Sequence, residues 1–261
     1  MSTHPLDALP IWAVYLLTVG VGLVAVEAGF YLGRYWQKRS GYQKSESVGA
    51  LVGATLGLFA FLLVFIIGIA SNRFDNRREL VLAEGNAVGT LYLRAGYLDE
   101  PDRIDIRNWL REYVDIRLDA AASPTHIPKA RARSEAIHTD IWSRAEALAR
   151  AYPDSVMVAL FIEALNDVID LHESRIVAVF NRIPVNIWSA IFFVALITLF
   201  MVGFNHGLSE SQNFVAQLAL ILVFASVILL ITDLDRPGEG FLQVSQQALS
   251  DLQQQLHGGS P

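Results

Sequence analysis

The stretch that decides the fold is Val48–Glu79, VGALVGATLGLFAFLLVFIIGIASNRFDNRRE. Its first 23 residues, Val48 to Ala70, carry no charged side chain. The hydrocarbon core of a bilayer needs about 20 apolar residues of helix, so this segment predicts a membrane span. A dense polar run follows from Ser71 to Glu79 without a proline. We therefore expect the helix to leave the membrane and continue into water as one rod.

Three further apolar segments accompany this one, and the spans are expected at about 11–32, 48–70, 184–204 and 214–232. Only 18% of the residues are charged, against about 25% in a typical soluble protein. Residues between the second and third spans show helical apolar periodicity and no alternating strand pattern. The sequence thus predicts an all-α polytopic membrane protein: a first transmembrane hairpin (1–70), a helical extramembrane domain (71–183), a second hairpin (184–232) and a polar C-terminal tail (233–261).

Composition and motifs argue against several functional classes. The chain has no cysteine, which excludes disulfides and thiolate chemistry, and its net charge of −6 argues against nucleic acid binding. Its six histidines form no H-x-x-x-H pair, and no P-loop or G-x-S-x-G motif is present. Carboxylates of the helical domain alternate with arginines, as on a solvated face of weak ion pairs. We expect no enzymatic activity, no cofactor and no metal.

Small and aromatic residues recur every four positions along the second span. Gly49, Gly53 and Gly57 form a stripe that permits close helix approach, and Phe61 and Phe65 continue it along the helix axis. One interpretation is helix packing followed by lipid-facing phenylalanines. The other is a hydrophobic constriction that gates a pore.

Acidic residues mark two other places. Glu27 lies inside the first span, where a carboxylate either faces the bundle interior in a functional role or snorkels to the headgroups. Asp233, Asp235 and Glu239 follow the fourth span. They are a possible gating or cation site, or they pair with the arginines that follow the second span.

The polar run resembles a known membrane-protein family. NRFDNRRE at Asn72–Glu79 resembles the end of the bestrophin pore helix. From that match, Phe61 and Phe65 fall on the bestrophin neck phenylalanines, and Gly57 falls where that family has a further apolar neck residue. Three longer runs, RFDNRRELVLAEGNAVGTLYLRAGYL, REYVDIRL and ITDLDRP, resemble the bacterial bestrophin-like family, a domain of unknown function. This resemblance covers about residues 48–250.

Two further landmarks agree with it. Ile183-Pro184 resembles the Ile-Pro that opens the third bestrophin span, and Asp233–Gly240 resembles the position of the bestrophin calcium-binding segment. The resemblance implies a homo-oligomeric ion channel in the bilayer, pentameric in bestrophins, whose pore is lined by the second span of every subunit. Bestrophins conduct mainly anions, although some bacterial members pass cations.

On this resemblance the pore-lining residues are Gly57, Phe61 and Phe65, and the pore mouth comprises Asn72, Arg73, Asp75, Arg77, Arg78 and Glu79. The chain departs from the family in three ways. Gly57 would make the constriction shorter or wider, the acidic exit is thinner than a calcium clasp, and the mouth mixes both signs of charge. Its arginines would either ring the pore or form salt bridges with Asp75, Glu79 and a neighbouring subunit.

Topology and function each leave an alternative. Loop 33–47 carries four basic residues, which by the positive-inside rule would place it in the cytoplasm and the helical domain outside. Bestrophin topology instead places the helical domain in the cytoplasm, and we favour that orientation, in the inner (plasma) membrane. The alternative to a channel is a non-conducting membrane scaffold or sensor whose helical domain binds a partner.

Overall fold

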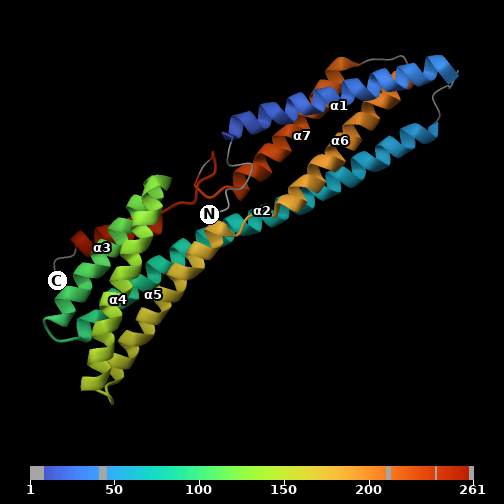
Figure 1. The fold of residues 1–261 in the computed structure, drawn as a ribbon. Helices are drawn as coiled ribbons and strands as arrows, with labels where there is room; N and C mark the ends of the chain where they lie inside the picture. Colours follow the sequence, from blue (N-terminus) through green and yellow to red (C-terminus); the bar gives the residue numbers. More distant parts are fainter. Residues whose placement is uncertain (1–8, 41–45, 210–212, 239, 259–261) are drawn as a thin grey trace. The chain divides into compact units, whose positions relative to one another are not determined.

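The computed structural model describes residues 9–40, 46–209, 213–238 and 240–258, and this part of the chain contains helices and no strands. The elements in chain order are α1 (Ile11–Ser40), α2 (Glu46–Arg94), η2 (Ala95–Tyr97), α3 (Asp102–Ala122), η3 (Pro124–His126), α4 (Ile127–Ala151), α5 (Val156–Phe180), α6 (Val185–Leu208), α7 (Phe214–Asp235) and α8 (Gln247–Gly258) (Figure 1). The all-α prediction is confirmed.

Four helical stretches are long and apolar enough to cross a membrane, and they lie within Ile11–Arg39, Ser47–Tyr97, Val156–Leu208 and Phe214–Asp235. The protein is therefore a polytopic membrane protein. The expectation of one continuous rod is also confirmed, because α2 runs unbroken from Glu46 to Arg94. The chain forms two compact units: a membrane unit of residues 1–73 and 182–242, and a helical unit of residues 74–181 and 243–261.

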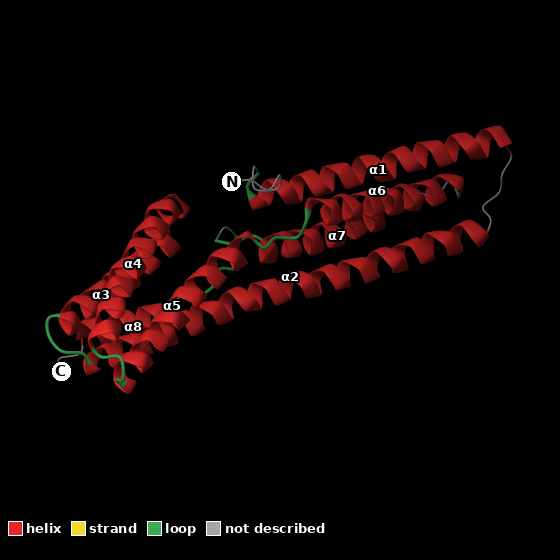
Figure 2. Cartoon of the chain, turned by 60° about the horizontal axis from the view of Figure 1, so that its bottom comes forward, coloured by secondary structure: helices red, strands yellow, loops and turns green. Residues whose placement is uncertain are grey.

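In the membrane unit, α1 packs lengthwise against α6 and also contacts α7 (Figure 2). Glycines make this approach close. A β-carbon at Gly29 or Gly33 would overlap the backbone carbonyl oxygen of Phe200 or Phe204 in α6. Gly203 and Gly207 of α6 meet backbone carbonyls of α1 in the same way. Backbones pressed together at small residues are a common way for membrane helices to associate.

The glycine stripe of the second span, Gly49, Gly53 and Gly57, does not take part in this α1–α6 contact. β-Carbons built at Gly49, Gly53 and Gly57 of α2 would meet nothing within 4 Å in the described part of the chain. Within one protomer, close helix packing therefore uses the glycines of α1 and α6, and the α2 stripe stays open.

The helical unit combines the C-terminal half of α2 with α3, α4, α5 and α8. Its apolar core is formed by side chains that recur at helical spacing along these helices. The largest fully buried apolar side chains include Ile106, Leu110, Ile137, Ile141, Phe161 and Leu165. Local signals set the helix ends: Ser155 Oγ caps α5 by accepting a hydrogen bond from Val158 N at 3.4 Å.

Helix α8 was not predicted, because residues 233–261 were treated as a polar tail. Leu249, Leu252 and Leu256 of α8 are buried in the helical unit, and their spacing of three and four residues places them on one face. The overlooked signal was this short apolar stripe among glutamines.

We predict that Gly29→Ala destabilises the protein by about 1–3 kcal/mol, because its new methyl group must displace the α6 backbone. Thermal unfolding of the purified protein in detergent measures the change. Gly20→Ala on the same helix is the matched control, since its β-carbon meets nothing within 4 Å in the described residues. Equal stability of the two variants would refute the close α1–α6 contact.

Candidate functional site

Helix α2 has two contrasting faces inside the membrane unit. Phe59, Leu63, Ile66 and Ala70 are buried toward the rest of the unit, and the Phe59 ring packs on Phe224 of α7 with centroids 4.8 Å apart. The other face carries Gly57, Phe61 and Phe65, and it is exposed: the two phenylalanines are 66% and 61% accessible. The three predicted pore-lining residues therefore share one open face of the protomer.

The predicted mouth residues are not equivalent. Asn72, Asp75, Arg78 and Glu79 are exposed, and Arg73 is half-buried. Arg77 is only 5% accessible. The exposed charges of this run are thus two carboxylates and one guanidinium, whereas the sequence contains three arginines and two carboxylates there.

Asp233, at the end of α7, is hydrogen-bonded to the backbone of the segment that follows this helix. Its carboxylate accepts hydrogen bonds from the backbone N–H groups of Phe241 at 2.8 Å and Leu242 at 3.1 Å. Gly240 has φ +135° and presses against this carboxylate, so that a β-carbon there would overlap Asp233 Oδ1. Asp233 therefore fastens the segment after α7 back onto the helix end.

Asp235, which is fully buried, fastens the start of α6. It accepts hydrogen bonds from Ile183 N at 2.9 Å and from Arg182 Nε at 3.0 Å. Arg236, next in the chain, donates to the carbonyl oxygen of Leu9 at 2.8 Å. The sequence suggests that Asp233 and Asp235 pair with the arginines after the second span; Arg182, before the third span, is an additional partner of Asp235. Glu239 lies outside the described residues, and Glu27 is half-buried on α1.

The helical unit contains a buried polar cluster, which we define as Glu84, Tyr113, Arg117, His138, His172 and Arg175. Glu84 is at its centre and is fully buried. Tyr113 Oη donates to Glu84 Oε1 at 2.5 Å, Arg117 Nε lies 3.2 Å from the same oxygen, and Arg175 pairs with Oε2. Burial opposes ionisation of Glu84, but Arg175 and Arg117 hold its pKa below its usual range.

The two histidines form the edge of this cluster. His172 Nδ1 lies 3.1 Å from Tyr113 Oη, while His138 packs its ring on Tyr113 at 5.1 Å and edge-on against His172 at 4.9 Å. Burial lowers the pKa of both imidazoles to about 4, so they are neutral at pH 7. At neutral pH the cluster holds one carboxylate and two guanidinium groups.

These residues come from four helices, and no sequence pattern brings them together. In the sequence, the histidines are informative only as possible metal ligands, and the acidic and basic residues of the domain have the pattern of a solvated face. A detectable signal was present: His138 lies one residue from Ile137 and three from Ile141, on the apolar side of α4.

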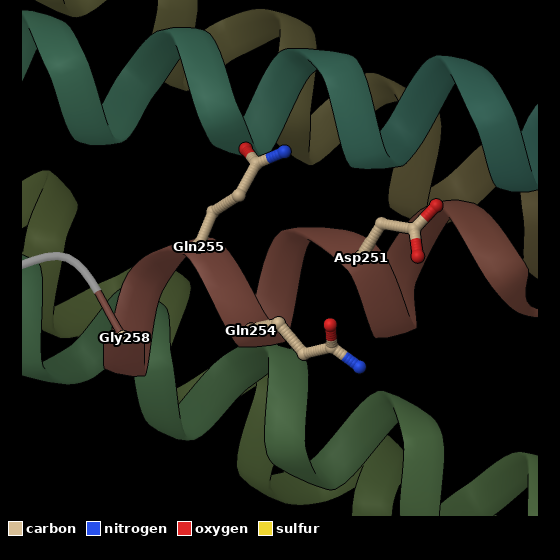
Figure 3. Close-up of a pocket in the computed structure, with 4 residues that line it drawn as sticks. All are labelled: Asp251, Gln254, Gln255 and Gly258. Atoms are coloured by element: carbon tan, nitrogen blue, oxygen red, sulfur yellow. The ribbon is translucent and has the colours of Figure 1, made fainter.

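The described residues were also compared with the requirements of a metal site and of a ligand pocket. No three or more His, Cys, Asp or Glu side chains gather there in a way that could hold a metal ion. A shallow surface pocket on α8 is lined by Asp251, Gln254, Gln255 and Gly258. Figure 3 shows that its three long side chains leave the helix in different directions, so they do not converge on a ligand.

We predict that Glu84→Gln lowers the free energy of unfolding by about 3 kcal/mol, because it leaves two buried guanidinium groups without their counter-charge. Chemical denaturation of the purified protein, followed by circular dichroism, measures the loss. Glu163→Gln is the matched control, since its ion pair with Arg94 is exposed and contributes little. A Glu84→Gln variant as stable as this control would contradict the assigned role of Glu84.

Comparison with known proteins connects this architecture to a family. The profile of the bestrophin-like domain matches residues 18–249. No curated protein matches the sequence at a significant level.

Solved structures share the fold. The crystal structure of a bacterial bestrophin homologue from Klebsiella pneumoniae, solved by zinc phasing, superposes with a TM-score of 0.67 at 14% identity, over 96% of this chain and 100% of that chain. A leucine-to-threonine mutant of the same homologue gives a TM-score of 0.68 at 14% identity, over 95% and 98% of the two chains. At such low identity these similarities describe the fold alone. Because the domain profile covers most of the sequence, the chain belongs to the bestrophin-like family.

Proposed function

We propose that the protein is an oligomeric ion channel rather than an enzyme, with a central pore lined by α2 of every subunit. The observation that carries this proposal is the open face of α2, on which Gly57, Phe61 and Phe65 make an apolar line. Membership of the bestrophin-like family supports it. Rings of phenylalanine around an axis would form a hydrophobic constriction, which gates ion flow by expelling water.

The glycines beside this line support assembly through the same helix. Gly49, Gly53 and Gly57 have open space where a side chain would be, and an adjacent copy could approach the α2 backbone closely there. The proposed assembly is a homo-oligomer, with five subunits favoured by the family resemblance. It would span the inner (plasma) membrane with the helical unit in the cytoplasm.

The exposed charges of the proposed pore mouth, Asn72–Glu79, favour cations at this end of the pore. Asp75 and Glu79 are exposed together with Arg78, whereas Arg73 is half-buried and Arg77 is only 5% accessible. Repeated around an axis, two exposed carboxylates per subunit outweigh one guanidinium, and rings of carboxylates attract cations. Asp233 and Asp235 are proposed as structural groups rather than as a cation site, because donors from the protein occupy their carboxylates.

We predict that Phe61→Ala and Phe65→Ala increase the current carried by purified protein in planar bilayers, because each shortens the hydrophobic constriction. Val24→Ala, at an exposed position on α1, is the control and should conduct like the unmodified protein. A stable oligomer that carries no current in any of these forms would refute the channel and favour the non-conducting scaffold or sensor.

We predict that Asp75→Asn and Glu79→Gln shift the reversal potential in a salt gradient toward anion permeation, since each removes a ring of negative charge. Arg78→Gln, which removes a ring of positive charge, should shift it in the opposite direction. The proposal about ion sign fails if the carboxylate variants leave the reversal potential unchanged or if the arginine variant shifts it the same way.

A further inference from the structure

The hydrogen bonds of the buried polar cluster assign a tautomer to His172. Tyr113 has a single hydroxyl proton, and at 2.5 Å that proton is donated to the Glu84 carboxylate. The contact of 3.1 Å between Tyr113 Oη and His172 Nδ1 is then a hydrogen bond in which Nδ1–H donates. A neutral His172 therefore carries its proton on Nδ1, and its lone pair lies on Nε2.

That lone pair is a vacant proton site inside the protein. Among the described residues, Nε2 of His172, Nε2 of His138 and the Ser134 hydroxyl are all buried and lack a hydrogen-bond partner. The three residues are 1%, 8% and 0% accessible, respectively. Ser134 and His138 lie one turn apart on the same face of α4.

Charges from every neighbouring helix act on this histidine pair. Helix α2 contributes Glu84, α3 contributes Tyr113 and Arg117, α4 contributes Glu135, and α5 contributes Arg175. The two arginines already exceed the one buried carboxylate, and Glu135 is exposed. Protons added to both imidazoles would bring two cationic rings, 4.9 Å apart, into an interior that is already positively charged.

We propose that the His138–His172 pair is a proton-binding site that controls the packing of α4 against α3 and α5. Neutral imidazoles hold α4 in place through ring contacts with Tyr113 and with each other. Protonation requires His138 on α4 and His172 on α5 to separate and reach water, so acid releases α4 from the bundle. This device does not depend on ion conduction by the protein.

The direction of the pH effect follows from linkage. Burial lowers the pKa of both histidines to about 4 in the packed state, and exposure to water returns it toward 6.5. The released state therefore binds more protons, and acid favours it. Between pH 7.5 and pH 5 the opening equilibrium is expected to shift on the order of 30-fold for each histidine. Glu112, which pairs with Arg133 of α4, stays ionised in this pH range because the hydrogen bond from Arg133 lowers the pKa of its carboxyl group.

Hydrogen exchange measured by mass spectrometry on the full-length protein in detergent tests this proposal. The readout is the protection factor of α4 amides at pH 7.5 and pH 5, corrected for the intrinsic pH dependence of exchange. The unmodified protein should lose protection in α4 at pH 5 by at least the factor expected for one histidine. The double variant His138→Phe/His172→Gln should keep its protection, because it retains a ring against Tyr113 and a donor toward Tyr113 Oη but has no titratable nitrogen.

Two further variants make the result decisive. His126→Gln removes an exposed histidine near the start of α4, which lies 3.0 Å from Asp119, and should respond to acid like the unmodified protein. His172→Gln alone provides a less disruptive test if His138→Phe prevents folding at pH 7.5, and this single variant should lose about one histidine's share of the acid response. Unchanged protection of the unmodified protein at pH 5, or an equal acid response in the double variant that lacks His138 and His172, would overturn the proposal.

Discussion

Both compact units depend on the unbroken backbone hydrogen bonding of α2, from Glu46 to Arg94. In a bilayer a helix must satisfy its own backbone polar groups, and the first half of α2 does so while presenting Phe59 and Leu63 to the membrane unit. The second half supplies Glu84, Val88 and Leu91 to the interior of the helical unit. One helix thus provides an apolar wall in one unit and the central carboxylate of the other.

Polar groups buried in the two units are held in different ways. Asp233 and Asp235 are bound largely by backbone N–H groups at a helix end, so they fix where the chain leaves and enters the membrane helices. Glu84, on α2, is instead held by side chains from two other helices, α3 and α5. Removing either kind of partner leaves a charged group buried in an apolar environment without a hydrogen bond or counter-charge. The resulting loss of stability is larger than the net contribution of the interaction itself. These carboxylates therefore specify the arrangement of the helices within each unit.

The sequence predicted the features that depend on local pattern. Apolar length identified the spans, and helical apolar periodicity identified the segment between the second and third spans as helical. It did not predict features set by tertiary contacts. Gly29 and Gly203 meet only after α1 and α6 pack, and the Glu84 cluster draws on residues up to 91 positions apart. Surface charge and buried charge look alike in a sequence, so the sequence could not distinguish Arg77, which is buried, from Arg78, which is exposed. The family resemblance, from the run at Asn72–Glu79, correctly indicated the fold.

The central claim is that Phe61 faces an ion-conducting pore. The protein has no cysteine, so Phe61→Cys introduces a unique thiol, and its current can be recorded while a charged, membrane-impermeant thiol reagent is added. If Phe61 lines the pore, the reagent changes the current of this variant and leaves the cysteine-free protein unaffected. A thiol that reacts fully while the current stays the same would place Phe61 outside the pore and contradict the account.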